Sequence, residues 1–246
     1  MPVFFIHSSA VAAGSIEITG ELAHHLRNVL RLRPGETITL VDEARQRYRA
    51  VTDSLSARSI VARIEGAPQP PPATGPEITL FPALLKGKKM DWLIQKATEL
   101  GVHAIAPVIS ERTMARPETE RGADRWRRIA LEAAQQSSRL DVPQIAPPIP
   151  LEALLAAPPA GDAGLILWER ERRPLRDVLQ GLPRRPRLSV IIGPEGGLAT
   201  QEVEHAIAAG YRPGSLGAPI LRAETASLAA LAMLLYEFGP NVSDWN

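Results

Sequence analysis

The first quarter of the chain alternates short apolar segments with turns. Between residues 1 and 66, apolar and polar side chains alternate with period two, as at Ile16 and Ile18. This pattern predicts β-strands, which we expect at residues 4–7, 15–19, 37–41, 47–51 and 59–64. One helix interrupts them, because apolar side chains recur at helical spacing at Leu22, Leu26, Val29 and Leu30. Short strands with one helix are typical of a small, mostly antiparallel β-barrel.

A proline-rich stretch separates this region from the rest of the chain. Residues 66–76 contain five prolines among eleven residues and show no apolar periodicity. Such a composition is typical of a stiff, extended connector. We therefore expect a first domain over residues 1–66, a linker over residues 67–76 and a second domain over residues 77–246.

After the linker, predicted strands alternate with predicted helices. Apolar runs predict strands at residues 78–84, 104–109, 165–168, 188–192 and 214–217. Helical periodicity predicts helices at about residues 88–100, 124–138, 200–209 and 225–238. This alternation predicts parallel strands joined by helical crossovers, which is the pattern of an α/β domain.

Composition excludes several classes of function. The 246 residues include no cysteine, which excludes disulfides, thiolate nucleophiles and sulfur-ligated metal sites. The five histidines have no partners at metal-ligand spacing, so we expect no metal. No apolar run approaches the ~18 residues of a membrane span, and no basic segment precedes the short apolar stretch at the start. We therefore expect no membrane partner, no secretory signal and a cytoplasmic location.

Net charge excludes a strongly basic protein, because 28 basic and 27 acidic residues give only +1. A polyanion would therefore have to bind through local patches. One candidate patch is a stripe at helical spacing, made of His24, Arg27 and Arg31. The other lies at the start of a predicted helix and consists of Lys86, Lys88 and Lys89. Cations are disfavoured at that end of a helix, which favours phosphate binding, with a solvated face as the alternative.

One glycine-rich loop lies where ligands bind in open α/β sheets, at the carboxyl end of a predicted strand. Residues 193–197 read Gly-Pro-Glu-Gly-Gly and follow the strand predicted at 188–192. The glycines allow positive φ angles and a close approach of the backbone to a ligand. A tight turn without a ligand has the same composition, and both interpretations stay open for this loop alone.

A second loop follows the strand predicted at 214–217 and leads into the last predicted helix. Ile220 and Leu221 are large apolar side chains in a loop, which indicates the lining of a pocket. Arg222 and Glu224 lie beside them at a helix amino terminus, where anions bind readily. Taken alone, this pair is equally typical of a surface ion pair.

Together the two loops resemble the S-adenosylmethionine pocket of the SPOUT methyltransferases. The stretches that carry this resemblance are GPEGG at residues 193–197 and LGAPILRAETA at residues 216–226. Three further stretches extend the resemblance to one family, ribosomal RNA small subunit methyltransferase E. These are HHLRNVLRLRPGE at 24–36, LLKGKKMDWLIQKATELGV at 84–102 and RWRRIALEAAQQSSRLDVP at 125–143. The resemblance covers nearly the whole chain.

This resemblance implies a SPOUT-type, trefoil-knotted parallel sheet with flanking helices, a PUA-like first domain that binds RNA, and a homodimer. It implies S-adenosylmethionine as the cofactor and methylation of N3 of uridine 1498 in 16S rRNA, within the small ribosomal subunit. The residues that it places around the cofactor are Leu167, Gly193, Pro194, Glu195, Gly196, Gly197, Leu216, Gly217, Ile220 and Leu221.

The chemistry of such a transfer fits the residue types found. Methyl transfer to N3 is an in-line displacement without a covalent enzyme intermediate, so alignment dominates and can supply roughly 7–11 kcal/mol of the barrier. The N3 proton must also be lost, and a cation that stabilises the deprotonated uracil would help. We hypothesise that Arg222 is catalytic and that Glu195 orients it. Glu195 or Glu224 acting as the base is the alternative.

Other functions remain open on the sequence alone. The same pocket could serve a methyltransferase that acts on another RNA, such as tRNA, or belong to a non-catalytic RNA-binding ribosome assembly factor. A nucleotide-dependent enzyme that uses residues 193–197 as a phosphate loop is disfavoured, because the loop lacks the lysine and the hydroxyl residue that hold phosphate and Mg²⁺.

Overall fold

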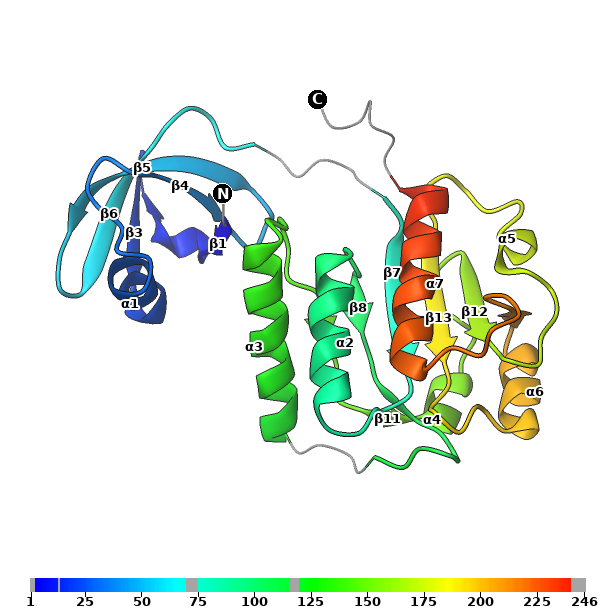
Figure 1. Ribbon diagram of the computed structural model, residues 1–246. Helices are drawn as coiled ribbons and strands as arrows, with labels where there is room; N and C mark the ends of the chain where they lie inside the picture. The colour runs from blue at the N-terminus through cyan, green and yellow to red at the C-terminus, as the bar shows by residue number, and fades with distance from the viewer. Residues whose placement is uncertain (1–2, 13, 70–74, 116–119, 240–246) are drawn as a thin grey trace. The chain divides into compact units, whose positions relative to one another are not determined.

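The computed structural model describes residues 3–12, 14–69, 75–115 and 120–239 (Figure 1). Its contacts divide the chain into two compact units. The first comprises residues up to 73 together with 132–142, and the second comprises the remainder. The division after residue 73 falls inside the segment predicted as a linker, while the predicted domain limits themselves stay predictions.

The first unit contains a mostly antiparallel sheet with the strand order β1-β4-β5-β6-β3-β2. Its strands are β1 (Val3–Phe5), β2 (Val11–Ala12), β3 (Ser15–Thr19), β4 (Thr37–Val41), β5 (Arg47–Leu55) and β6 (Ser59–Ile64). Only β1 and β4 pair in parallel among these described strands. The period-two pattern points inward as predicted, since Ile16, Ile18 and Ile60 are buried in one core. The five predicted strands are present, and β2 is the one that the pattern missed.

The helix of the first unit, α1 (Gly20–Asn28), is shorter than predicted. Leu26 of this helix is fully buried. Val29 and Leu30 lie beyond the end of the helix, and their side chains are 63% and 46% exposed. Arg31 adopts a left-handed conformation with φ of 54°, and such a residue ends a helix. The predicted stripe of three basic residues on one helix face is therefore wrong for Arg31.

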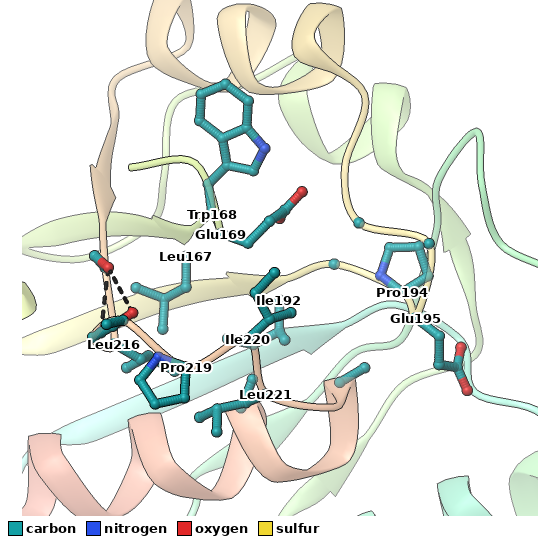
Figure 2. Close-up of a pocket in the computed structure, with 18 residues that line it drawn as sticks. Leu167, Trp168, Glu169, Ile192, Pro194, Glu195, Leu216, Pro219, Ile220 and Leu221 are labelled. Atoms are coloured by element: carbon teal, nitrogen blue, oxygen red, sulfur yellow. Dashed lines mark hydrogen bonds between the residues drawn. The ribbon is translucent and has the colours of Figure 1, made fainter. Parts of the chain in front are cut away.

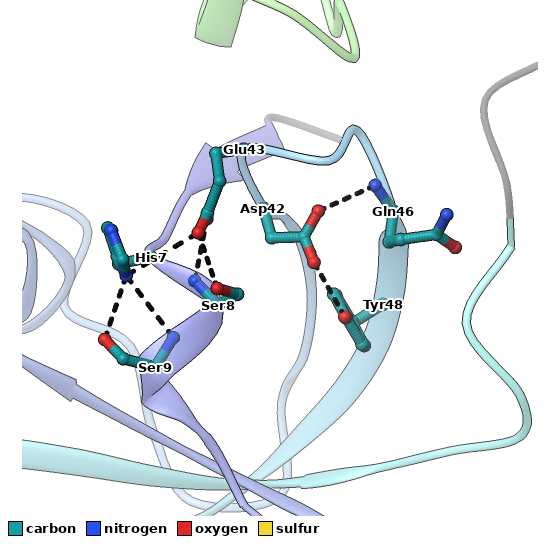
Figure 3. A network of polar contacts seen from close by, with 7 residues as sticks. All are labelled: His7, Ser8, Ser9, Asp42, Glu43, Gln46 and Tyr48. Atoms are coloured by element: carbon teal, nitrogen blue, oxygen red, sulfur yellow. Dashed lines mark hydrogen bonds and ion pairs between the residues drawn. The ribbon is translucent and has the colours of Figure 1, made fainter.

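Two adjacent carboxylates after β4 are held by hydrogen bonds, and one of them, Glu43, ties this turn to the start of the first unit (Figure 3). Glu43 accepts hydrogen bonds from the Ser8 backbone N–H at 2.7 Å and from the Ser8 hydroxyl at 2.5 Å. These bonds, the hydroxyl one above all, lower the pKa of Glu43 to about 2. Asp42 is buried and accepts a hydrogen bond from the Tyr48 hydroxyl at 2.8 Å. Neutral donors therefore hold this carboxylate pair in place.

The second unit contains a parallel sheet with the strand order β10-β8-β7-β13-β12-β14. Its strands are β7 (Glu77–Pro82), β8 (Ala104–Ile105), β10 (Gln144–Ile145), β12 (Ala163–Leu167), β13 (Arg187–Ile192) and β14 (Tyr211–Gly214). A separate parallel pair joins β9 (Val108–Ile109) to β11 (Ile149–Pro150). The continuous burial of β12 and the near-continuous burial of β13 are typical of strands covered on both faces.

The helices that flank this sheet are α2 (Lys88–Glu99), α4 (Leu151–Leu155), α5 (Leu175–Val178), α6 (Thr200–Ala208) and α7 (Ala223–Phe238). A further helix, α3 (Glu120–Gln136), belongs to this unit as far as residue 131. α2 and α7 pack against each other, and α7 also contacts β7 and β13 (Figure 1). The predicted α/β domain is thereby confirmed. The short elements α4, α5, β10 and β11 were not predicted.

Two predicted strands of this unit were wrong in their limits. Residues 104–109 form two short strands in different sheets, because Pro107 between them has no N–H to donate. The strand predicted at 214–217 is β14, which ends at Gly214. Residues 215–217 therefore belong to the loop that follows the strand, where the backbone of Ser215 is hydrogen-bonded to the segment around Pro174. Within the described residues, no helix is long and apolar enough to cross a membrane.

Candidate functional site

The carboxyl ends of three neighbouring strands open into one cavity of about 280 Å³ (Figure 2). β12 lies between β13 and β14 in the parallel sheet, so the loops after all three strands leave from the same edge. Residues 167–169, 192–197 and 215–221 line the cavity, together with Ala223 and Ala226 of α7. This edge of the sheet is where ligands bind in open α/β folds.

All ten residues that the resemblance places around the cofactor line this cavity. They come from three segments of the sequence, and the sheet order rather than sequence proximity brings them together. The two glycine-containing loops do not follow adjacent strands, because β12 separates β13 from β14. Their role in binding stays a prediction, while their meeting in one cavity is an observation.

The floor of the cavity is apolar. Leu167 and Ile192 are buried at the ends of β12 and β13, and Leu216 and Leu221 are half-buried in the loop opposite. Ile220 is 81% exposed although it lines the same cavity. Figure 2 shows these side chains between the strand ends and the loop that follows β14. A flat apolar ligand would therefore find contacts on two sides.

Two glycines of the loop after β13 are required by close packing. Gly197 has a φ of +70°, and a Cβ there would lie 2.5 Å from Oε1 of Glu169. A Cβ at Gly193 would lie 2.9 Å from Cγ of Leu198. Real Cβ atoms do not come this close to another heavy atom, so a larger residue would displace Leu198 at position 193 and the flexible Glu169 carboxylate at position 197. The loop therefore presents backbone to the cavity where side chains would fill it.

Glu195 pairs with Lys89 of α2. Lys89 Nζ lies 2.7 Å from Oε1 of Glu195 and 3.7 Å from Oε1 of Glu224. The hydrogen bond lowers the pKa of Glu195 and raises that of Lys89. Glu195 therefore stays ionised and is a weak base. The predicted contact through which Glu195 would orient Arg222 is not formed among the described residues, because Lys89 holds the carboxylate.

Arg222 is left with a free guanidinium at the amino terminus of α7. Its side chain is exposed and has no hydrogen-bond or ion-pair partner within the described ranges. The charge of Arg222 opposes the rise in the Lys89 pKa, so the two cations lie within electrostatic reach. The neighbours of Arg222 in sequence, Leu221 and Ala223, line the cavity. A positive charge is therefore available beside the cavity.

Glu224, the next acidic residue along the chain, is 9% exposed in the first turn of α7. Its Oε2 atom is buried and has no hydrogen-bond partner among the residues described. The positive end of the helix dipole favours a carboxylate at this position. With one lysine between two carboxylates, the cluster ties the first turn of α2 to the loop after β13 and to the start of α7.

The predicted RNA contacts are exposed for the most part and remain untested. His24 is exposed on α1, whereas Arg27 donates a hydrogen bond to the Ser56 carbonyl at 2.7 Å. Lys86 and Lys88 are exposed, without partners in the part of the chain that the structure describes. Lys89, predicted with them as a phosphate contact, is instead engaged by Glu195. Prediction from charge alone could not tell these lysines apart.

Sequence reasoning missed several residues of the cavity wall, among them Trp168 and Glu169. Trp168 and Glu169 follow directly after β12 and line the cavity. The signal that could have found them is their place at the carboxyl end of a buried strand, which the predicted strand at 165–168 already indicated. The described residues contain no group of three or more potential metal ligands.

Family models match both parts of the chain. An RNA methyltransferase domain matches residues 73–235, and an RNA methyltransferase PUA domain matches residues 18–65. The ribosomal RNA small subunit methyltransferase E of Bacillus subtilis is 32% identical over 238 residues, which cover 92% of this chain and 91% of that protein. The protein of the same name from Synechocystis is 33% identical over 226 residues, or 91% of this chain and 74% of that one.

Solved structures resemble the whole chain. The crystal structure of a ribosomal RNA small subunit methyltransferase E from Neisseria gonorrhoeae, bound to S-adenosyl methionine, matches with a TM-score of 0.85 and 33% identity over 97% of this chain and 98% of that one. A methyltransferase from Legionella pneumophila, in complex with the same cofactor, matches with a TM-score of 0.85 and 28% identity over 97% and 98%.

Proposed function

Because the chain belongs to the ribosomal RNA small subunit methyltransferase E family, we propose that it methylates N3 of uridine 1498 in 16S rRNA with S-adenosylmethionine. One observation carries the proposal: ten residues from three separate segments, each expected beside the cofactor, line a single cavity. Solved relatives of this chain were crystallised with that cofactor, which supports the same ligand here.

The cavity fits an adenosyl group. Leu167, Ile192 and Leu216 offer an apolar surface to a purine ring, and ligand pockets are mostly apolar with a few placed polar groups. Gly193 and Gly197 present backbone where a Cβ would collide with the cavity wall. Backbone N–H and C=O groups can therefore come within hydrogen-bond distance of a flat ring. Residues 193–197 and 216–221 would hold the adenosyl group between them.

When bound, S-adenosylmethionine supplies an electrophilic methyl group, whose bond to sulfur breaks with its electron pair left on sulfur as the bond to N3 forms. The loops align the two reactants, which is the main catalytic requirement of such a displacement. The N3 proton is lost to solvent, and negative charge develops on the uracil oxygens. Arg222 is permanently charged and has free N–H donors, so it stabilises that charge.

Glu195 supports this site without acting as the base. The bond from Lys89 lowers the pKa of Glu195, and a base is weaker the lower its pKa. Its contribution is to fix Lys89 and the loop after β13 beside the start of α7. This arrangement keeps the carboxylate from pairing with Arg222, whose guanidinium stays available to the substrate.

Substrate RNA would be held by the PUA-like first domain and by exposed cations. His24, Arg27 and Arg31 belong to the first unit, and Lys86 and Lys88 to the second. Replacing one cation that binds a phosphate should flatten the salt dependence of RNA binding by roughly 0.7–0.9 units on a log–log plot. The trefoil knot and the homodimer implied by the resemblance stay predictions, as does the cytoplasmic location expected from composition.

The test is direct analysis of the product. Small ribosomal subunits and free 16S rRNA from a strain that lacks this activity are incubated with the protein and S-adenosylmethionine, and nuclease fragments are analysed by mass spectrometry. We expect one new methyl group, on N3 of uridine 1498. Methylation of tRNA instead, or RNA binding without methyl transfer, would replace the proposal by one of its two alternatives.

A further inference from the structure

One corner of the cavity carries polar groups without partners. Trp168 and Glu169 follow β12, and both line the cavity. The Trp168 Nε1 atom is buried and has no hydrogen-bond partner among the residues that the structure describes. Within the same residues, no hydrogen bond or ion pair engages the Glu169 carboxylate. An unpaired buried donor is costly, so this corner suits a ligand group that completes it.

The packing around this corner holds the Trp168 ring, whereas the Glu169 side chain is exposed. The Trp168 ring packs against the apolar cluster beneath α6, and the guanidinium carbon of Arg170 lies 5.9 Å from its ring centre. The Glu169 carboxylate lies against the backbone of Gly197, where only a glycine leaves room for it. In Figure 2 the nitrogen-bearing edge of the Trp168 ring is turned toward the side where the Glu169 carboxylate lies.

We propose that Trp168 and Glu169 bind the ribose hydroxyls of the cofactor, an inference that rests on the proposed function. A hydroxyl both donates and accepts hydrogen bonds, so it can donate to the Glu169 carboxylate while it accepts from Trp168 Nε1. Carboxylates recognise ribose hydroxyls in this way in dinucleotide-binding folds. The corner also adjoins Leu167 of the apolar floor, and the ribose is bonded directly to the purine that this floor suits.

The charged tail of the cofactor fits this corner less well. Its ammonium group donates hydrogen bonds but accepts none, so it would leave the Trp168 donor unpaired. Its carboxylate could accept from Trp168 Nε1 but would be repelled by the negative charge of Glu169. Of the polar groups of the ribose and the amino-acid tail, only the ribose hydroxyls match both side chains at once.

Calorimetry with two ligands separates these groups. S-adenosylhomocysteine carries both the ribose and the amino-acid tail, and 5′-methylthioadenosine carries the ribose without that tail. For Glu169→Gln we expect both ligands to bind roughly ten- to a hundredfold more weakly, as for the loss of a hydrogen bond to a charged group. Trp168→Phe, which keeps an aromatic ring, should weaken both ligands severalfold. Glu204→Gln, which removes an exposed carboxylate of α6 outside the cavity, is the matched control.

Each other outcome overturns the inference. A loss confined to S-adenosylhomocysteine would assign Glu169 to the ammonium group. Unchanged affinity for both ligands would make Glu169 a surface carboxylate without a role in binding. If the wild-type protein bound neither ligand, the proposed cofactor itself would fall and the inference with it. Melting curves of each variant verify that the protein remains folded.

Discussion

The two sides of the cavity differ in how their charges are satisfied. On the side of α2 and α7, one lysine lies between two carboxylates, and Glu195 is bonded at 2.7 Å. On the side of β12, Glu169 and the Trp168 nitrogen have no partners within the described residues. The first side contains an ion pair, although Oε2 of Glu224 is buried there without a hydrogen-bond partner among the described residues, whereas the second side contains no ion pair within those residues.

This difference assigns different tasks to acidic residues that look alike in sequence. A carboxylate already paired with a lysine holds loops together and contributes little further hydrogen bonding. A carboxylate without a partner keeps its acceptors for a ligand. The paired side thereby leaves the guanidinium of Arg222 without a partner among the described residues, and the unpaired side is where we propose that the ribose binds.

The largest effect is expected from replacing Arg222, whose guanidinium has no partner among the described residues. Arg222→Ala should lower the rate of methylation by roughly 10²–10³, as for other losses of a single donor to a developing oxyanion. Affinity for S-adenosylhomocysteine should change by less than about twofold, because the guanidinium lies outside the cavity lining. Single-turnover kinetics and calorimetry measure the two quantities. Arg212→Ala, an exposed arginine of β14, is the control, and equal rates for both variants would assign the charge stabilisation elsewhere.

The next largest effect is expected from a substitution at Gly197, whose backbone lies beside the Glu169 carboxylate. Gly197→Ala places a methyl group against the Glu169 carboxylate at a φ of +70°, so the carboxylate must move. We expect about tenfold weaker binding of S-adenosylhomocysteine, from the loss of one charged hydrogen bond. Gly181→Ala shares the backbone strain, with φ of +80°, but its Cβ meets nothing within 4 Å.

The same substitution should have little effect once Glu169 is absent. In the background Glu169→Ala, we expect Gly197→Ala to weaken binding by less than about twofold, because residues in contact are not additive. A full tenfold loss in that background would show that the glycine acts through the ligand rather than through the carboxylate.

Breaking the paired side should have an effect of similar size, on the rate rather than on cofactor binding. Lys89→Met releases Glu195, and we expect about tenfold slower methylation, since misplaced groups cost up to about 10²-fold. Lys89→Arg should restore most of the rate. Lys96→Met removes a lysine of the same helix that pairs with Glu99 at 2.7 Å and serves as the control.

The pH dependence of unfolding checks the same pair. The pKa of Glu195 is lowered from 4.5, so its contribution to stability is present above 4.5 and is lost as pH falls through the lowered value. The pKa of Lys89 is raised from 10.5, so its contribution is present below 10.5 and is lost as pH rises through the raised value. The melting difference between wild type and Lys89→Met should therefore close at both ends of the pH range. A constant difference would exclude the ion pair as its cause.

The smallest effect concerns a carboxylate held by neutral donors outside the cavity. Ser8→Ala removes the hydroxyl that contributes most to the lowered pKa of Glu43. We expect that pKa to rise from about 2 toward 4.5, as measured by NMR titration of the side-chain carboxyl. Methylation and cofactor binding should stay unchanged. A pKa that stays near 2 would mean that the backbone donor suffices.

Much of this architecture could be predicted from local patterns. Period-two alternation identifies strands such as β3 and β6, because one face of each must be buried. The glycine-rich loop after β13 could be located because three glycines among five residues are typical of a tight turn or of a close approach of the backbone to a ligand. The limits of α1 could not, since the apolar spacing continues through Val29 and Leu30 after the helix has ended.

The partners of charged residues were beyond prediction for a physical reason. Lys89 and Glu195 are 106 positions apart, and only the packing of α2 beside the loop after β13 makes them neighbours. The three lysines at 86, 88 and 89 therefore looked alike in sequence, although Lys89 is bonded to Glu195, which lines the cavity. Glu169 was overlooked because a charged residue after a buried strand has the composition of any surface turn.

The order of pairing in the second sheet has a consequence for biosynthesis. β12 pairs only with β13 and β14 among the described strands, and both are translated after it. On the ribosome, the apolar stretch Ala163–Leu167 therefore emerges with two open edges, and open edges promote aggregation. Nascent chains halted before residue 211 should accordingly engage chaperones and fail to retain nucleosides.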